Sequence, residues 1–155
     1  MKKKFLTLIF ILSLTACGFK VVNQSELANF KISEMTTSGD KKINYVIKNK
    51  LNPYSKDNLN NIITIELKTE KQKTIKEKNI NNEVTKYNIK INIDVEIIEL
   101  KSNKKHKFKL SKSGEYSVAS QYSQTLSNEK KLIKVYSDVL ANELLEEIIR
   151  RLNAV

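Results

Sequence analysis

Cys17 carries the most specific chemistry, since it is the only cysteine among the 155 residues. It follows Leu14, Thr15 and Ala16 and precedes Gly18, and together these five residues match the bacterial lipobox. In that motif the cysteine thiol takes a diacylglyceryl group, the peptide is cleaved before the cysteine, and the new amino terminus is acylated. The motif therefore predicts a covalent lipid at Cys17, made of S-diacylglycerol and an N-acyl chain, and no further cofactor.

The segment before Cys17 has the composition of a secretory signal peptide. A run of lysines at 2–4 precedes an apolar stretch at 5–14, which is too short to cross a membrane. The alternative is an ordinary signal peptide that contains a cysteine by chance. We expect a signal peptide at 1–16, a lipidated tether at 17–29 and a single domain at 30–155. Gly18, in the place of an aspartate, favours the inner leaflet of the outer membrane, with the domain facing the periplasm.

The charge of the chain leaves two explanations open. Of 28 basic residues, three lie in the signal segment, so 25 remain against 17 acidic residues, a net charge of +8. An acidic partner such as anionic headgroups or lipopolysaccharide phosphates would explain this excess, while the expected compartment excludes nucleic acid. However, only Arg150 and Arg151 are arginines, and the abundance of Lys, Asn and Ile is also typical of an AT-rich genome.

One basic cluster is a candidate phosphate-binding site. Lys104, Lys105 and Lys107 lie at a predicted turn, and Lys109 continues the same strand edge. Ammonium groups can hold phosphates as point charges, so this cluster is a candidate contact for lipid A. The alternative is a solvated, lysine-rich turn.

Enzymatic chemistry is poorly supported by the sequence. His106 is the only histidine, and we interpret it as a surface residue of a strand. No Gly-x-Ser-x-Gly elbow is present, and three glycines cannot form a phosphate-binding loop. Asp94 and Glu96 occupy alternate positions on one strand face that also carries lysines, which indicates paired surface charge rather than a catalytic carboxylate pair. We predict that the protein is not an enzyme and holds no metal.

The first half of the domain alternates between strand and helix signals. Residues 30–35 alternate as a strand, 36–40 are expected to form a turn with Asp40 as N-cap, and Ile43 to Leu51 have helical spacing up to Asn52-Pro53. A second strand is predicted at 61–69. The lysine-rich stretch at 70–83 is expected to be an extended hairpin loop or frayed strand ends.

The second half contains the clearest strand. Residues 86–97 alternate strictly between apolar and polar, which predicts a sheet covered on one side only. A fourth strand carries Phe108 and Leu110, and a final helix of about 25 residues starts at Glu129 with Ser127 as N-cap. The predicted fold is α+β, a two-layer α/β sandwich in which a mixed four-stranded sheet has two helices on one face (β-α-β-β-β-α). Its expected core pairs a row of the third strand with the last helix: Ile91, Ile93 and Val95 with Val139, Leu140 and Leu144.

The whole predicted mature chain resembles the LptE family of lipopolysaccharide-assembly lipoproteins. The resemblance rests on the lipobox followed by Gly18-Phe19, on the order of elements, on the passage 113–117 with Tyr122, and on 141–144 within a helix that ends in basic residues. The chain departs from the family at 20–22, where many members carry a proline and a leucine.

The resemblance implies a non-enzymatic role. Such a lipoprotein plugs the lumen of an outer-membrane β-barrel, LptD, helps that barrel assemble, and aids delivery of lipopolysaccharide to the outer leaflet. The implied partners are LptD, lipopolysaccharide and, through the lipid anchor, the membrane, with no nucleic acid. The alternative is a generic periplasm-facing outer-membrane lipoprotein that acts as a scaffold or assembly factor for another envelope partner. Copurification with a large β-barrel distinguishes the two.

Overall fold

The computed structural model describes residues 30–55 and 61–153. The predicted signal peptide at 1–16 and the tether at 17–29, with Cys17, lie outside the described residues. The elements, in chain order, are β1 (Lys31–Gly39), α3 (Lys41–Leu51), the 3-10 helix η2 (Asn52–Ser55), β2 (Ile62–Lys78), β3 (Val84–Glu99), β4 (Lys105–Ser117) and α4 (Tyr122–Asn153). The predicted β-α-β-β-β-α order is thus confirmed.

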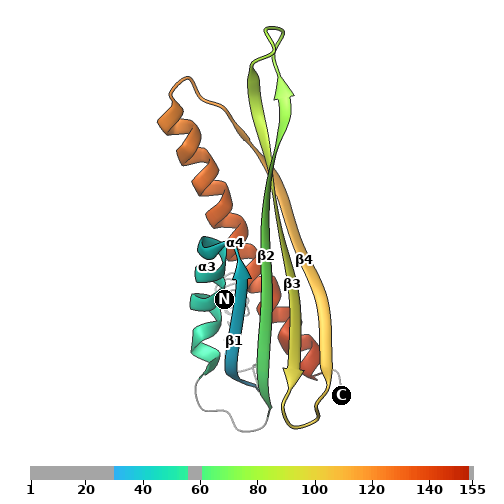
Figure 1. Ribbon diagram of the computed structural model, residues 1–155. Coiled ribbons are helices and arrows are strands. Elements are labelled where there is room, and N and C mark those ends of the chain that lie inside the picture. Colours follow the sequence, from blue (N-terminus) through green and yellow to red (C-terminus); the bar gives the residue numbers. More distant parts are fainter. Residues whose placement is uncertain (1–29, 56–60, 154–155) are drawn as a thin grey trace, which may run out of the picture.

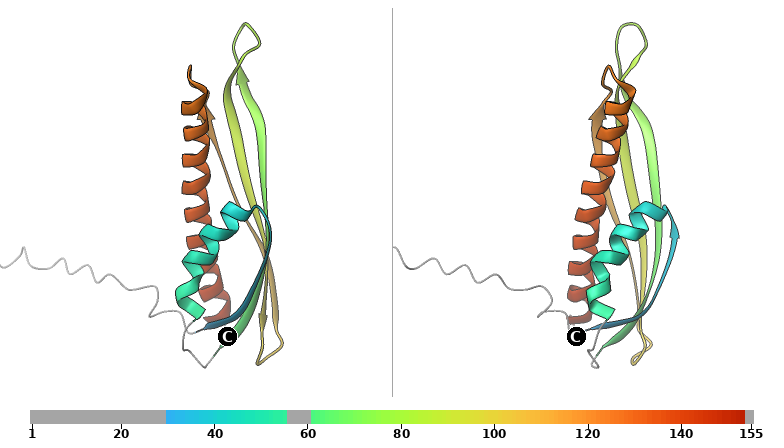
Figure 2. Two further views of the ribbon diagram at one scale, coloured as in Figure 1. Left: turned by 60° about the vertical axis from the view of Figure 1, so that its left-hand side comes forward. Right: turned by 90° about the vertical axis from the view of Figure 1, so that its left-hand side faces the viewer.

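The four strands form one mixed sheet in the order β1-β2-β3-β4. β1 runs parallel to β2, and α3 supplies the crossover connection that a parallel pair needs, whereas β2–β3 and β3–β4 are antiparallel hairpins (Figure 1). Both helices lie on the same side of the sheet (Figure 2). The predicted α+β two-layer sandwich is therefore correct.

Alternation along β3 decides which side of the sheet is covered. Its apolar row is buried, with at most 3% of any side chain exposed: Ile89, Ile91, Ile93, Val95 and Ile97. The residues between them are polar or charged and face the opposite side. We call the side under the helices the covered face and the opposite side the outer face.

The start of α3 is fixed by polar contacts that the sequence only partly reveals. The Asp40 carboxylate accepts hydrogen bonds from the backbone N–H groups of Lys42 and Ile43, so the predicted N-cap is correct. Behind it, the Thr69 hydroxyl donates to the side-chain oxygen of Asn44 over 2.9 Å. Gly39 has φ +92°, and a Cβ there would lie 1.8 Å from the Thr69 carbonyl oxygen, so only glycine fits.

Two strands are longer than predicted. β1 continues through the expected turn at 36–40 up to Gly39, because these residues pair with 66–69 of β2. β2 continues as a regular strand up to Lys78, through most of the stretch expected as an extended hairpin loop or frayed strand ends, and only residues 79–83 separate it from β3. Pairing with β3 satisfies the backbone of this charged stretch, which its own composition does not favour as strand.

The last helix also begins earlier than predicted. α4 starts at Tyr122, so Ser127 lies inside the helix and is not its N-cap. Just before the helix, the Ala119 N–H donates to the Thr125 hydroxyl over 2.9 Å, which ties the incoming chain to the first turn. The predicted burial of Leu140 and Leu144 is correct, whereas Val135, earlier in the helix, is 47% exposed.

The predicted core residues are buried in the structure, with one exception. Of the predicted core residues, only Val139 is not fully buried. The helix contributes a broader buried stripe than expected, comprising Leu140, Ala141, Leu144, Leu145, Ile148 and Leu152. Within the described ranges, no helix is both long and apolar enough to cross a membrane.

We predict that Ile93→Ala lowers the free energy of unfolding by about 2–5 kcal/mol, because it leaves a cavity at a position with no exposed surface. Asn92→Ala, one residue away on the outer face, removes only a hydrogen bond from Ser111 and is expected to cost less than about 1 kcal/mol. Urea denaturation followed by circular dichroism measures both. Equal losses would contradict a sheet that is buried on one side only.

Candidate functional site: the outer face of the sheet

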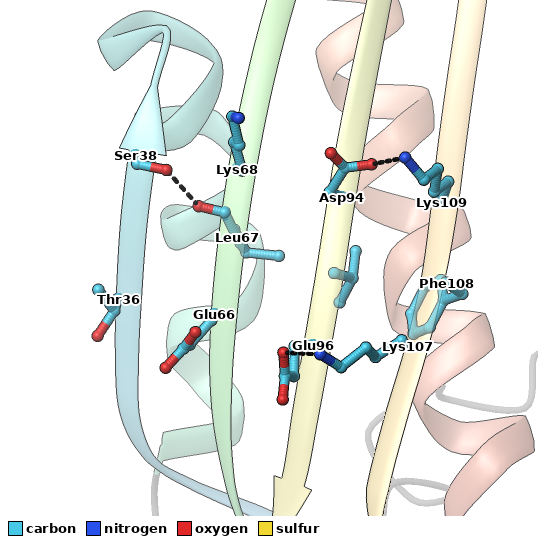
Figure 3. Close-up of a pocket in the computed structure, with 11 residues that line it drawn as sticks. Thr36, Ser38, Glu66, Leu67, Lys68, Asp94, Glu96, Lys107, Phe108 and Lys109 are labelled. Carbon is cyan, nitrogen blue, oxygen red and sulfur yellow. Dashed lines mark hydrogen bonds and ion pairs between the residues drawn. The ribbon is translucent and has the colours of Figure 1, made fainter.

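The outer face carries two adjacent rows of polar side chains that run across all four strands. The strand register sets these rows: Thr36, Glu66, Glu96 and Lys107 in the first, and Ser38, Lys68, Asp94 and Lys109 in the second. Residues of both rows line a groove of about 610 Å³, whose lining Leu67, Val95 and Phe108 complete (Figure 3). This groove was not predicted from the sequence.

Opposite charges balance in this groove. Three carboxylates face three lysine ammonium groups, and the closest pairs join Lys107 to Glu96 over 2.8 Å and Lys109 to Asp94 over 3.0 Å. The hydrogen bond from Lys107 holds the pKa of Glu96 below its usual value, so both groups stay charged. Because the charges cancel, the groove suits a polar, mixed-charge partner better than a free anion.

The structure brings together three of the four predicted phosphate contacts. Lys105, Lys107 and Lys109 point from β4 to the outer face, with 59%, 70% and 81% of their side chains exposed. Lys104 lies outside them, in the turn before β4, where its backbone carbonyl accepts from the Glu99 N–H. The three strand lysines each lie within 4 Å of a β3 carboxylate, with Lys105 the most distant at 3.9 Å from Glu96. Phosphate binding by this cluster stays a prediction.

His106 is not the surface residue that the sequence suggested. Strand alternation turns it to the covered face, where its side chain is 10% exposed and its Nε2 lies 2.6 Å from Glu99 Oε1. Hydrogen bonds from His106 and Ser102 lower the pKa of Glu99. Within residues 30–55 and 61–153, no group of three His, Cys, Asp or Glu side chains is arranged to hold a metal ion.

A polar network on the covered face joins α4 to the far half of the β2–β3 hairpin. The Glu129 carboxylate accepts from Lys73 over 2.7 Å and from the Tyr116 hydroxyl over 2.8 Å. The Lys73 ammonium also lies 4.3 Å from the centre of the Tyr87 ring, which stacks on Tyr116. Sequence reasoning noted Glu129 only as a first-turn helix residue and missed this network.

The network shifts the ionisation of its members. Burial raises the pKa of Glu129, but hydrogen bonds from Lys73 and Tyr116 outweigh it and leave that pKa below its usual value. Burial lowers the pKa of Lys73, yet the bond to Glu129 more than compensates, so its pKa is raised. Both groups are therefore charged at neutral pH and hold the hairpin against α4.

Two residues of the passage at 113–117, Gly114 and Tyr116, position β4 against α4. A Cβ at this position would lie 1.8 Å from the Tyr136 hydroxyl oxygen, so glycine lets the Tyr136 side chain from α4 lie directly on β4. Two residues further, Tyr116 reaches Glu129. Both residues thus fix the distance between β4 and the first half of α4.

No protein-family model matches the chain, and no curated protein matches its sequence. Its fold is similar to those of three solved bacterial proteins. Rare lipoprotein B from Shewanella oneidensis has 13% identity and a TM-score of 0.59, over 74% of this chain and 92% of that one. The minor lipoprotein from Acinetobacter baumannii has 13% identity and a TM-score of 0.59, over 78% and 91%. The uncharacterized lipoprotein B from Nitrosomonas europaea has 12% identity and a TM-score of 0.62, over 88% and 94%.

At these identities the similarity shows a shared fold and nothing finer. It extends over nearly the full length of each of the three proteins. The arrangement of a four-stranded sheet with helices on one face is therefore that of a fold also found in proteins described as lipoproteins.

We predict that Glu129→Gln lowers the free energy of unfolding at pH 7 by about 1–2 kcal/mol, because it weakens two hydrogen bonds to a carboxylate. A group whose pKa is lowered by folding stabilises the protein above its unfolded pKa, about 4.3, and loses that contribution as the pH falls through its folded pKa. The difference in the free energy of unfolding between wild type and Glu129→Gln should thus become smaller below about pH 4.3.

Thermal unfolding followed by circular dichroism between neutral pH and pH 3 measures this difference. Glu34→Gln, at an exposed position of β1, is the matched control and should leave stability unchanged at every pH. If the stability difference between wild type and Glu129→Gln does not vary with pH, the charged Glu129 carboxylate is not what stabilises this contact.

Proposed function

We propose that this chain is an outer-membrane lipoprotein of the LptE type. In this role it is anchored through Cys17, plugs a β-barrel lipopolysaccharide translocon, helps that barrel assemble, and aids delivery of lipopolysaccharide to the outer leaflet. The proposal assigns it no catalytic activity, and the lipid on Cys17 is its only covalent group.

One combination of observations carries the proposal. The sequence contains a lipobox at Cys17, and the domain that follows has a fold similar to those of three solved lipoproteins. The motif and the fold are independent, since the lipobox lies outside the residues that form the fold. Both favour a lipid-anchored envelope protein.

The outer face supports the choice of a barrel as partner. The lumen wall of an outer-membrane barrel is polar, and a plug needs a polar surface to lie against it. The outer face of this sheet offers three lysines and three carboxylates within two neighbouring rows. A surface of this kind pairs with a polar wall without burying unpaired charge.

The lysines of β4 support a role in contacting lipopolysaccharide. Lys105, Lys107 and Lys109 share one exposed face, and Lys104 precedes them in the turn. Phosphates of lipid A would compete with Asp94 and Glu96 for these ammonium groups. The contact is therefore expected to be weak and sensitive to salt.

We predict that the lipidated protein, purified from native membranes in mild detergent, carries with it a stoichiometric, large β-barrel protein. Copurification of such a barrel is expected for a translocon, because a protein seated inside the barrel lumen stays bound when the membrane is dissolved. Mass spectrometry of the copurified proteins identifies the partner. Recovery of a different envelope partner, with no barrel, would support the scaffold alternative and contradict the proposal.

Cys17→Ala is the control for the anchor. With the acceptor thiol gone, the domain should still fold but should leave the membrane fraction after a carbonate wash, when the barrel is absent from the host. Retention of the variant in a barrel-free membrane would show that the lipobox does not anchor the protein.

A separate prediction concerns the lysines. Changing Lys104, Lys105, Lys107 and Lys109 together to glutamine should weaken binding of purified lipopolysaccharide by about tenfold, at about 0.3 kcal/mol for each exposed ion pair. The barrel complex should remain intact. Lys41→Gln with Lys42→Gln, at the start of α3, should change neither, and equal losses in both variants would show that binding reflects diffuse net charge.

A further inference from the structure

The sheet has two edges, and only one of them is both short and irregular. β1, at one edge, is nine residues long and has a register shift between Ile32 and Glu34 in its pairing with β2. Short length and a bulge are two ways in which proteins prevent unwanted strand pairing. β1 therefore offers little straight backbone to another strand.

β4, at the other edge, lacks both devices. It is 13 residues long and pairs with β3 without a register shift from Lys105 to Ser117. It contains no proline. Figure 1 shows no element beside its outer edge, and within the described residues no backbone–backbone hydrogen bond joins that edge to another segment. Only at its last residue does a side chain bind the strand's backbone, where the Asn128 amide donates to the Ser117 carbonyl oxygen over 3.2 Å. The edge is thus long, straight and available.

Side chains along this edge define what would pair with it. On the outer face, Lys107 and Lys109 are more than two-thirds exposed and have carboxylates only on the β3 side. On the covered face, Phe108 and Leu110 are only partly buried. An incoming strand would therefore meet cations on one face and incompletely covered apolar groups on the other.

We propose that the edge of β4 binds an extended segment of a different polypeptide, in which acidic residues alternate with apolar ones. The acidic side chains would pair with the outer-face lysines, the apolar ones would cover Phe108 and Leu110, and main-chain hydrogen bonds would extend the sheet by one strand. A second copy of this chain paired over the same segment would place lysine opposite lysine, which is destabilising. The inference does not depend on the proposed function.

The test uses the detergent-purified lipidated protein and a fluorescent, end-blocked peptide of about ten residues in which glutamate and valine alternate. A peptide of the same composition with paired residues, Glu-Glu-Val-Val, is the control for alternation. Fluorescence anisotropy measures binding, and hydrogen–deuterium exchange locates it. We expect the alternating peptide alone to bind and to slow amide exchange in β4, with β1 unchanged.

Two double variants test whether peptide binding depends on the lysines at the β4 edge or on the net charge of the outer face. Lys107→Glu with Lys109→Glu should weaken peptide binding at least about tenfold, because two favourable cross-strand pairs become unfavourable. Lys68→Glu with Lys90→Glu makes the same change of charge on the outer faces of β2 and β3 and should change binding less than about twofold. Circular dichroism confirms that both variants are folded, and Lys107→Gln with Lys109→Gln replaces the first if it is not.

Three results would overturn the proposal. They are equal binding of the two peptides, equal losses in the two double variants, and binding without slower exchange in β4. The exchange experiment on the wild-type protein decides the question even if a variant fails to fold.

Discussion

Burial of alternate side chains along β3 is the constraint on which the rest of the structure depends. The row from Ile89 to Ile97 has almost no exposed surface, and it belongs to one of the two central strands of the sheet. A strand shows one side-chain row to each face, so covering this row commits the whole sheet to one covered and one outer face. Both helices must then lie on the covered side, and the outer face is left to solvent or to a partner.

The two helices do not cover the sheet equally along its length. α3 and the second half of α4 cover the end with the isoleucine core, whereas the β2–β3 hairpin extends beyond α3 (Figure 1). There, covering depends on the first half of α4 and on polar contacts, chiefly those between Glu129, Lys73 and Tyr116. Gly114 allows the close approach of Tyr136 that brings this part of α4 to the sheet. Apolar burial thus holds one end of the molecule, and a charged network holds the other.

The sequence predicted what depends on local periodicity and missed what depends on partners distant in the chain. The alternation of β3 and the Asp40 cap are local signals, and both were correct. Residues 70–83 were expected to form an extended hairpin loop or frayed strand ends because they are rich in lysine, but pairing with β3 makes 70–78 a regular strand. His106 was placed on the surface by its lysine neighbours, although period two places it on the opposite face from them. The groove on the outer face could not be predicted, because its residues come together only through the order of the four strands, and periodicity within one strand says nothing about that order.

We propose that the outer face, which one-sided burial leaves uncovered, is the surface that meets a partner in the envelope. Site-specific photocrosslinking in intact cells tests it most directly, with the probe at Lys68 or Lys90 on the outer face and at Tyr45 or Lys48 on the exposed side of α3. The account predicts that the outer-face probes form an adduct with a large β-barrel protein. Adducts from the α3 probes, with none from the outer-face probes, would contradict it.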